Sequence, residues 1–254
     1  MKIEAVTVCV GYADFLAQTV PHNLPLFDRW VVVTVPGDIE TRDICRRHNL
    51  YTLTTEEDTR DGPFSKGRMV RKGLEQLHSD DWLVHLDADL ALPYDLRHSL
   101  EQAHLDPDTI YGIDRVMVTG WDDWQRVRLG GYLQGGQRDF HSRVNFLAGL
   151  PVGARWASPS HGFVPIGFFQ LWHSSAAYRL NVHQRPYPMG HGTAARSDVQ
   201  HGLQWDRRKR ALLPEVIGVH LESGPSSLGA NWAGRTTKRF GPVPRIKKEL
   251  GGPS

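Results

Sequence analysis

The sequence has few cysteines, little excess charge and no long hydrophobic run. Its two cysteines, Cys9 and Cys45, lack the spacing of a metal site, so we expect reduced structural thiols. A net charge of only +2 gives no argument from bulk charge for a nucleic-acid or membrane partner. No apolar stretch approaches the roughly 20 residues that span a bilayer. Glu4 interrupts the first apolar run, which argues against a signal peptide. These absences favour a cytoplasmic protein without a transmembrane segment.

Two phosphate-binding patterns are also missing. The motif G-x-x-x-x-G-K-[ST] does not occur, which excludes a P-loop enzyme. A sugar nucleotidyltransferase needs a glycine-rich, basic phosphate loop directly after its first strand, and this chain has "VGYADF" (10–15) there, with a single glycine and no basic residue. We keep a sugar nucleotidyltransferase only as an alternative.

Strand and helix patterns alternate through the first half of the chain. Runs rich in β-branched residues predict strands, and apolar residues at helical spacing predict the helices between them. The predicted strands are 3–10, 30–35, 50–55, 82–90, 109–118, 167–173 and 215–223. The predicted helices are 15–27, broken near Pro21, then 39–49, 66–78 and 197–210, the last capped by Ser197. This order predicts an α/β fold with a mostly parallel sheet covered by helices on both faces, and ligands of such sheets bind beyond the carboxyl ends of the strands.

The apolar run "DWLVHLDADLALP" (81–93) leads into two aspartates, Asp87 and Asp89. Alternate residues of a strand point to the same side, so both carboxylates can converge on one ligand. The sequence shows no basic neighbour, and two adjacent carboxylates repel each other unless a cation lies between them. Mg²⁺ and Mn²⁺ prefer oxygen ligands and often complete their coordination with substrate phosphates. The motif therefore predicts a site for a metal and a diphosphate, with a solvated strand end as the alternative.

Several segments, in order, resemble the GT-A fold glycosyltransferases, particularly their inverting, family-two-like group. Besides the D-x-D strand, the segments are "FSKGRMVRKGLEQL" (64–77), "GFFQLWH" (167–173), "ARSDVQHGLQW" (195–205), "LPEVIGVHLES" (213–223) and "GANWAGR" (229–235). The chain is also similar to small soluble glycosyltransferases encoded by bacteriophages. The resemblance implies one Rossmann-like GT-A domain over 1–254. Its expected parts are a donor half (about 1–118), a less regular acceptor and catalytic half (about 119–240) and a basic tail rich in proline and glycine (241–254).

The resemblance assigns metal-binding and catalytic roles to four residues. Asp89 binds Mn²⁺ or Mg²⁺, Asp87 shares the ion or contacts the donor ribose, and His220 completes the protein ligands, with a structural core imidazole as its alternative. Asp198 matches the general base that deprotonates the acceptor hydroxyl, which implies transfer with inversion. The family usually has Glu-Asp where this chain has Ser197 and Asp198, and a plain helix N-cap is the alternative interpretation.

The resemblance also implies contacts to a nucleotide-sugar, with a UDP-sugar as the expected donor. The predicted donor-binding residues are Val10, Gly11, Tyr12, Asp38, Lys66, Arg68, Arg71, Asp87, Trp232 and Arg235. Gly11 lets the backbone approach the base and Tyr12 can stack on it, whereas the basic residues of 66–71 have a solvated face as their alternative. Residues 223–235 are expected to form a mobile lid, in which Trp232 covers the donor and Arg235 pairs with its pyrophosphate.

The acceptor stays open at this level. Trp121, Trp124 and Trp156 lie among arginines, and such aromatic rings pack on sugars, stack on splayed bases or belong to a core. One acceptor class is a glycan, a glycolipid head or a protein hydroxyl. The other is a hydroxymethylated base in phage DNA, modified in the host cytoplasm, which the phage likeness and the basic tail favour. A non-catalytic nucleotide-sugar-binding module is the alternative to a transferase.

Overall fold

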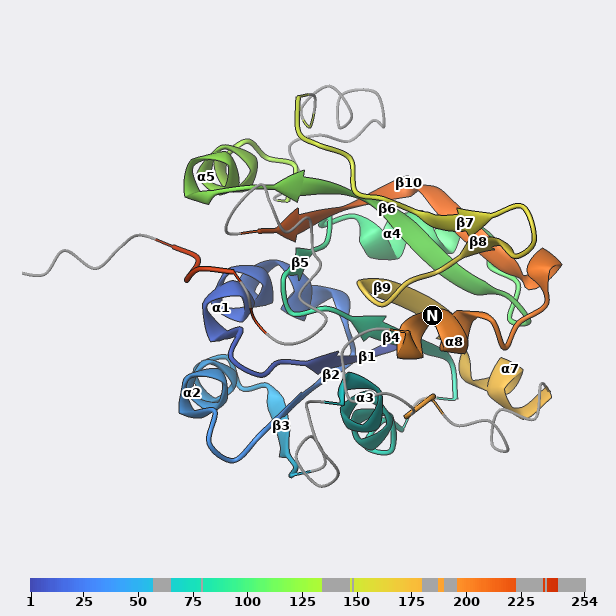
Figure 1. Ribbon diagram of the computed structural model, residues 1–254, viewed down its shortest axis with the longest axis horizontal. Coiled ribbons are helices and arrows are strands. Elements are labelled where there is room, and N and C mark those ends of the chain that lie inside the picture. Colours follow the sequence, from blue (N-terminus) through green and yellow to red (C-terminus); the bar gives the residue numbers. More distant parts are fainter. Residues whose placement is uncertain are drawn as a thin grey trace, which may run out of the picture.

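A computed structural model of the protein describes residues 1–56, 65–78, 80–133, 147, 149–179, 187–189, 196–222, 235 and 237–241. Its centre is an eight-stranded sheet in the order β3-β2-β1-β4-β9-β6-β10-β5, and β7 and β8 form a separate hairpin (Figure 1). The strands are β1 (Ile3–Val8), β2 (Arg29–Thr34), β3 (Tyr51–Thr54), β4 (Trp82–Leu86), β5 (Leu90–Ala91), β6 (Ile110–Val118), β7 (Trp156–Ser158), β8 (Gly162–Val164), β9 (Phe169–His173) and β10 (Arg210–Leu221).

The strand directions confirm the predicted α/β class with a mixed, mostly parallel sheet. β1 runs parallel to β2 and β4, β2 runs parallel to β3, and β6 runs parallel to β10. β9 lies between β4 and β6 and is antiparallel to both, and β5 is antiparallel to β10. Every residue of β1 is buried, as expected for a strand covered on both faces.

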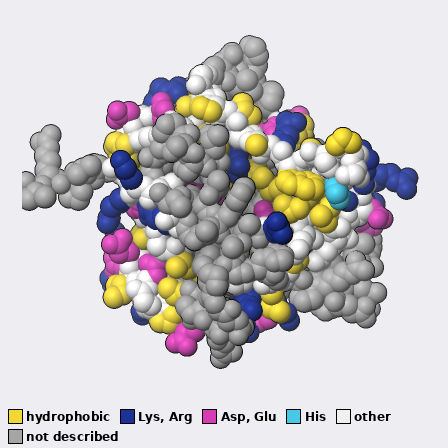
Figure 2. Space-filling model, viewed as in Figure 1, with side chains coloured by type: hydrophobic (Ala, Val, Ile, Leu, Met, Phe, Trp, Pro, Cys, Tyr) yellow, Lys and Arg dark blue, Asp and Glu magenta, His cyan; other side chains and the backbone are white. Residues whose placement is uncertain are grey.

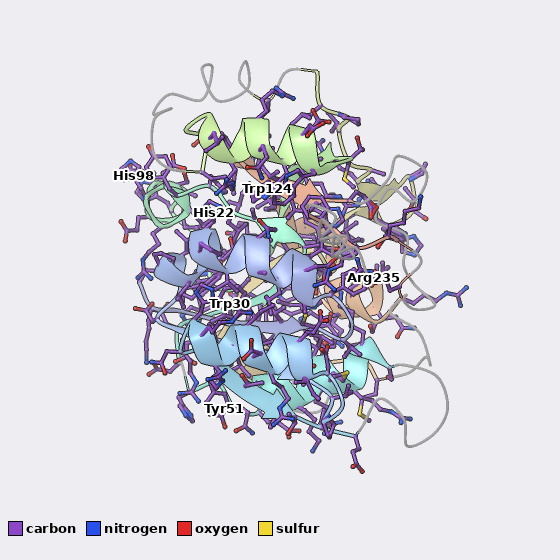
Figure 3. The ribbon with its side chains drawn as sticks, turned by 90° about the vertical axis from the view of Figure 1, so that its left-hand side faces the viewer. His22, Trp30, Tyr51, His98, Trp124 and Arg235 are labelled. Carbon is purple, nitrogen blue, oxygen red and sulfur yellow. The ribbon has the colours of Figure 1, made fainter. Side chains whose placement is uncertain are left out.

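Helices cover both faces of the sheet. The helices are α1 (Ala13–Asn23), α2 (Ile39–Arg47), α3 (Lys66–Leu74), α4 (Leu96–Gln102), α5 (Trp121–Leu129), α7 (Ser174–Arg179) and α8 (Ser197–Gly202), with 3₁₀ turns η1 (Leu24–Leu26) and η2 (Arg207–Lys209). Figures 1 and 3 show α1 and α2 side by side. Both helices share a hydrophobic cluster with Ile3 and Ala5 of β1, whereas Val6 and Val8 pack with α3. The alternation along β1 thus sends successive side chains to opposite helix layers.

Several predicted boundaries are wrong. Pro21 lies in the last turn of α1 and does not break the helix. The helix ends at Asn23, and the 3₁₀ turn η1 follows directly. The predicted helix 197–210 ends at Gly202, and β10 begins at Arg210 because the segment pairs with β6 from there onward. The register of that pairing shifts between Leu213 and Ile217, around Pro214, which cannot donate to the ladder.

Two predictions about the whole chain can be compared with the described ranges. Cys9 and Cys45 are both buried and unpaired, and burial raises the pKa of each thiol. No helix within these ranges combines the length and hydrophobicity that crossing a membrane requires. The predicted basic tail lies outside the described residues beyond Gly241.

Candidate active site

The two aspartates of the D-x-D motif lie in a turn at the carboxyl end of β4. Three neighbouring elements fix the backbone of this turn. Asp87 donates its N–H to the Phe168 carbonyl (3.1 Å), and the Asp89 carbonyl accepts the Leu221 N–H (2.8 Å). Thr19 of α1 donates its hydroxyl to the Ala88 carbonyl (2.7 Å). Both carboxylates are therefore held at the sheet edge where ligands of parallel sheets bind.

Asp89 lies beside His220, the other residue predicted to bind the metal. The short strand β5 pairs Leu90 with His220 of β10, which places the two side chains together. Asp89 Oδ1 is 3.2 Å from His220 Nε2, and the side chains are only 13% and 3% exposed. Asp89 Oδ1 has no well-aligned hydrogen bond and His220 Nδ1 has no partner among the described residues. Burial, the largest single effect, raises the pKa of Asp89, but the attraction and hydrogen bonding of His220 together with the charge of Lys66 make the net shift downward.

The expectation that no basic residue neighbours the aspartates is wrong. Lys66, at the start of α3, places its ammonium group in contact with Asp87 Oδ1. Burial, the largest single effect, lowers the pKa of Lys66, but Asp87, with smaller contributions from Asp198 and Asp89, makes the net shift upward. Lys66 therefore stays protonated. Asp87 already has a cation from its own chain, so Asp89 and His220 are the residues of the predicted metal site that would hold an ion.

The charges around this motif fit a divalent cation. Asp87, Asp89, Glu222 and Asp198 all act electrostatically on Arg115 of β6 and raise its pKa, although burial, the larger effect, lowers it. Four carboxylates thus gather around the motif, and Lys66 and Arg115 are among the cations that act on them in the described part of the chain. Within the described residues, no group of three or more His, Cys, Asp or Glu side chains is close enough to hold an ion alone. Asp89 and His220 would therefore supply only part of a coordination shell, and the other ligands would have to come from a diphosphate and water.

Asp198 is oriented by a backbone group rather than by a capping role. Its Oδ2 accepts the Gly167 N–H at 2.6 Å, and no described residue donates to Oδ1. A Cβ on Gly167 would lie 2.9 Å from Asp198 Cβ, so this approach requires glycine. The predicted cap at Ser197 is wrong, because the N-cap of α8 is Arg196, in a left-handed conformation (φ 74°) and without a side-chain cap hydrogen bond. Residues 197 and 198 are therefore not the N-cap, but Asp198 lies in the first turn of α8, and a structural role there stays the alternative.

A buried polar chain lies beneath the site. His85 Nδ1 is 3.0 Å from the Tyr187 hydroxyl, which donates to Gln170 Oε1 (3.3 Å). Gln170 Nε2 in turn donates to the Asp198 carbonyl (2.9 Å). His85 Nε2 lies 3.9 Å from Asp87 Oδ1, so the chain joins the surroundings of Asp87 to those of Asp198. Sequence patterns do not point to these residues, apart from one signal: His85 is a histidine inside the apolar run before the aspartates.

Gly11 and Asp38 shape the predicted nucleobase region. Gly11 has a φ of 69°, a conformation that favours glycine. Asp38 accepts the Gly11 N–H (2.8 Å) and also caps α2 by accepting the Thr41 N–H (3.1 Å). A pocket lies here, lined by Gly11, Ala13, Asp14, Gly37, Asp38, Ile39, Glu40, Arg235 and Arg239. The structure therefore gives Asp38 a positioning role, and its contact with a uridine stays a prediction.

Arg235 is bound to its own chain. Its N–H groups reach both oxygens of Asp14 (2.6 and 2.7 Å) and three backbone carbonyls, those of Gly11, Thr237 and Lys238. These five acceptors match the five N–H groups of a guanidinium, which also lies 5.1 Å from the centre of the Tyr12 ring. Figure 3 shows Arg235 at the end of α1 opposite His22. In this conformation no N–H remains for a pyrophosphate, so that predicted contact requires these bonds to exchange.

The other predicted donor residues fall into three groups. Val10 is partly buried against the cluster that contains Met69. Arg68 is half-buried, whereas Arg71 lies 3.6 Å from Glu75 and 3.4 Å from Met189 and does not reach the aspartates. Trp232, with the rest of the predicted lid at 223–234, lies outside the described residues.

The three tryptophans of the predicted acceptor half have different surroundings. Trp124 is fully buried, packs edge-on against His22 and donates to Gln18 (3.1 Å), so it belongs to the core (Figure 3). Trp121 is partly buried against Phe240. Trp156, in β7, is partly exposed and lines a second pocket.

His201 of α8 is buried among aromatic rings. Its ring centre lies 4.8 Å from that of Trp172, 4.5 Å from Tyr187 and 5.0 Å from Trp205. Neither ring nitrogen has a hydrogen-bond partner in the described part of the chain. Burial lowers its pKa to about 3, and the imidazole is neutral near pH 7.

We expect the protein to lose stability in acid through this histidine. An unfolded imidazole takes up a proton near pH 6.5, whereas the folded one does so only near pH 3. The free energy of unfolding should fall by about 1.4 kcal/mol per pH unit below pH 6.5 from this group alone. His201→Leu should therefore flatten the profile, losing about 2 kcal/mol less than the wild type between pH 6.5 and pH 5. Urea unfolding across this range measures the difference.

The matched control is His98→Leu, because His98 is exposed (Figure 3). Its profile should follow that of the wild type. Equal acid slopes for the wild type and His201→Leu would contradict the assignment.

No family model and no curated protein matches this chain. Among solved structures, glucosyl-3-phosphoglycerate synthase from Mycobacterium tuberculosis, in complex with Mn²⁺ and UDP-glucose, is 12% identical with a TM-score of 0.45, covering 90% of this chain and 74% of that one. A 4-diphosphocytidyl-2C-methyl-D-erythritol synthase from Anaerococcus prevotii is 11% identical with a TM-score of 0.44, covering 85% and 89%. Mannosyl-3-phosphoglycerate synthase from Rubrobacter xylanophilus is 17% identical with a TM-score of 0.38, covering 48% of this chain and only 42% of its own length. These are distant likenesses of α/β folds.

Proposed function

We propose that the protein is a metal-dependent glycosyltransferase of the GT-A type that transfers a sugar from a nucleotide-sugar, expected to be a UDP-sugar, to an acceptor hydroxyl with inversion. The observation that carries this proposal is the Asp89–His220 contact at 3.2 Å, at the carboxyl edge of the sheet and beside the Lys66–Asp87 pair. Buried polar atoms that lack hydrogen-bond partners are expected where a ligand completes the site. In this proposal, residues 1–118 form most of the donor half and 119–240 the acceptor half.

The leaving group is handled by Asp89, His220 and Lys66. Asp89 and His220 would hold Mn²⁺ or Mg²⁺, and the bound ion neutralises the diphosphate and the charge that grows on the departing nucleotide. Lys66 holds Asp87 in place and keeps a positive charge beside the same region. Gly11 and Asp38 line the base pocket. On the sequence resemblance we also propose donor contacts for Val10, Tyr12, Arg68, Arg71, Trp232 and Arg235.

Asp198 acts as the general base in this proposal. Its Oδ2 is fixed by the Gly167 N–H, so the carboxylate has a defined orientation toward an acceptor. It accepts the proton of the acceptor hydroxyl while that oxygen forms a bond to the anomeric carbon. The bond from this carbon to the phosphate oxygen breaks, and its electron pair leaves with the nucleoside diphosphate. A single displacement of this kind inverts the anomeric configuration.

A thermal-shift screen of nucleotide-sugars with Mn²⁺, followed by product analysis, tests the proposal. A UDP-sugar at about 100 times its Kd should stabilise the protein by about 2.7 kcal/mol, and EDTA should cancel the effect. The released nucleotide should be a diphosphate. Release of pyrophosphate would identify a nucleotidyltransferase instead, binding without turnover would identify a binding module, and no stabilisation by any donor would reject the proposal.

The acceptor screen should include both classes left open by the sequence. Glycans and glycolipid heads represent the first, and duplex DNA containing hydroxymethylated bases represents the second, the substrate expected for a phage-like enzyme in a host cytoplasm. Binding to DNA should weaken steeply with salt if phosphates are contacted. An affinity for DNA that does not change with salt would count against the second class.

A further inference from the structure

Gln170 is a fully buried glutamine that bonds directly to the main chain of the proposed base. It lies on β9, and the antiparallel register pairs it with His85 of β4. Its Nε2 donates to the carbonyl of Pro165 (2.8 Å) and to that of Asp198 (2.9 Å). These two bonds match the two N–H groups that a glutamine amide offers.

The groups around the Gln170 amide fix its orientation. Two carbonyl oxygens lie at Nε2, whereas Oε1 accepts the Tyr187 hydroxyl (3.3 Å). Turning the amide over would place its oxygen against both carbonyls, and two acceptors form no hydrogen bond. Gln170 therefore has one orientation, in which it is the donor to Asp198.

Asp198 is consequently held at two points by the segment 165–170. Its side chain accepts the Gly167 N–H at Oδ2 (2.6 Å), and its main-chain carbonyl accepts Gln170 Nε2. Pro165, the other acceptor of Gln170, lies two residues before Gly167. Gln170 thus ties the turn that carries the Gly167 N–H to the main chain of the residue whose carboxylate this N–H orients.

These bonds lie in apolar surroundings. Gln170 is fully buried, and Figure 2 shows hydrophobic side chains gathered on the surface where Figure 1 draws β8 and β9. A Cβ on Gly202 of α8 would lie 3.1 Å from the Pro165 carbonyl oxygen, so the helix and the turn are in close contact. Away from water, hydrogen bonds are strengthened and an unpaired carbonyl is costly. Removing the amide is therefore expected to shift the backbone around Asp198.

A purely structural glutamine is the competing explanation, and Gln18 shows what one looks like. Gln18 Oε1 accepts the indole N–H of Trp124 (3.1 Å). This bond joins α1 to α5, two helices that also share a hydrophobic cluster through Phe15 and Trp124. Gln170, in contrast, has both of its N–H groups directed to the backbone that places the proposed base.

We propose that Gln170 is a positioning residue: it holds Asp198 and the turn containing Gly167 in a fixed relation, so that the carboxylate faces the acceptor hydroxyl. This inference rests on the proposed transferase function. Gln170 takes no part in the bond changes and acts through Asp198. Because a displacement of about 1 Å at a reacting group can cost about 100-fold in rate, its effect should appear in kcat.

The Gly167 amide proton reports the position of Asp198 without any activity. A short hydrogen bond to a carboxylate moves an amide proton downfield, and the resonance is identified by its loss in Gly167→Ala. Gln170→Met keeps the length of the side chain and removes both N–H groups, and it should move the Gly167 proton upfield. The matched control, Gln18→Met, should leave this proton unchanged. An unchanged Gly167 resonance in Gln170→Met would overturn the proposal.

A double-mutant cycle tests the role in the reaction. With the substrates found by screening, Gln170→Met should lower kcat by about 10- to 100-fold, and the Kd for UDP with Mn²⁺ should stay within about twofold of the wild-type value. In the Asp198→Asn background, Gln170→Met should change kcat by less than about threefold, because no base is left to position. A structural role predicts the same loss in both backgrounds, and that result would contradict the proposal.

Tyr187→Phe provides a milder variant in case Gln170→Met does not fold. It removes the hydroxyl that donates to Gln170 Oε1 and leaves both bonds from Nε2 in place. It should lower kcat by a smaller factor than Gln170→Met, and only while Asp198 is present. A kcat equal to that of the wild type would count against Gln170 as a positioning residue.

Failure of this inference and failure of the proposed function look different. If the protein is not a transferase, wild type will release no diphosphate from any nucleotide-sugar, and the Gly167 resonance alone shows whether Gln170 holds Asp198. If only the role of Gln170 is wrong, wild type will transfer sugar and Gln170→Met will do so at a similar rate.

Discussion

Asp89→Asn is expected to lower kcat/KM for sugar transfer by about 10³-fold, or about 4 kcal/mol of transition-state stabilisation. The substitution removes the carboxylate charge 3.2 Å from His220 and leaves an amide of nearly the same shape. An amide oxygen binds a hard cation more weakly than a carboxylate does, and the negative charge on the leaving diphosphate then lacks its counterion. The loss should therefore appear in metal-dependent donor binding as well as in turnover.

Calorimetry of UDP binding with and without Mn²⁺ measures the loss of metal-dependent donor binding. Thermal unfolding measures the same loss without relying on activity. In EDTA, Asp89→Asn should be less stable than wild type, because it removes one partner of a buried pair with His220, so the gain from Mn²⁺ and UDP is measured against each variant's own metal-free stability. With Mn²⁺ and UDP, wild type should gain stability and Asp89→Asn should not. The control is Asp106→Asn, which removes a surface carboxylate paired with Lys209. Mn²⁺-dependent stabilisation that survives in Asp89→Asn would reject the metal assignment.

The sheet and the position of the D-x-D motif could be predicted from local patterns. The valine-rich runs of β1 and β2 mark strands buried on both faces, and alternation with helices marks parallel pairing. Ligands of such sheets bind beyond the carboxyl ends of the strands, and Asp87 and Asp89 were predicted at that edge, where the structure has them. The insertion of β9 between β4 and β6 was not predictable in this way, because periodicity identifies a strand without giving its neighbours.

The pairing of charges at the site depends on contacts between distant segments. Lys66 and Asp87 are 21 residues apart, and only the packing of α3 against β1 decides that the ammonium group reaches Asp87. Arg235 and Asp14 are 221 residues apart, and their bidentate contact uses a guanidinium that the sequence pattern assigned to a pyrophosphate. Residue type indicates that a group can bind an anion, and tertiary structure decides whether the protein itself supplies that anion.

Gln170 could not be predicted at all. Nothing in "GFFQLWH" distinguishes it from an ordinary strand glutamine, and its bonds to Pro165 and Asp198 become visible only in the folded chain. Asp198 lies between these cases. Its place at the start of a helix was predictable, whereas its bond to Gly167, from a segment 31 residues earlier, was not.

Asp198→Asn is expected to lower kcat by about 10²- to 10⁴-fold, the usual contribution of a general base. An asparagine can still accept the Gly167 N–H through its amide oxygen, so the side chain keeps its orientation and loses only its ability to take a proton. The Kd for UDP with Mn²⁺ should therefore stay within about twofold of the wild-type value, since this hydrogen bond and not the charge fixes the geometry.

Comparing Asp198→Asn with Gly167→Ala distinguishes a proton-accepting role of Asp198 from a purely structural one. A structural role predicts that Asp198→Asn, which conserves the Gly167 bond, retains most of its rate, and that Gly167→Ala, which forces Cβ to within 2.9 Å of Asp198, is the more damaging change. A base predicts the reverse order for kcat. Asp206→Asn serves as the control, because Asp206 is an exposed carboxylate shortly after the same helix. The acceptor oxygen, deprotonated by Asp198, attacks the anomeric carbon from the side opposite the leaving group. NMR of the wild-type product should therefore show an inverted anomeric centre. A retained configuration would reject Asp198 as the base of a single displacement.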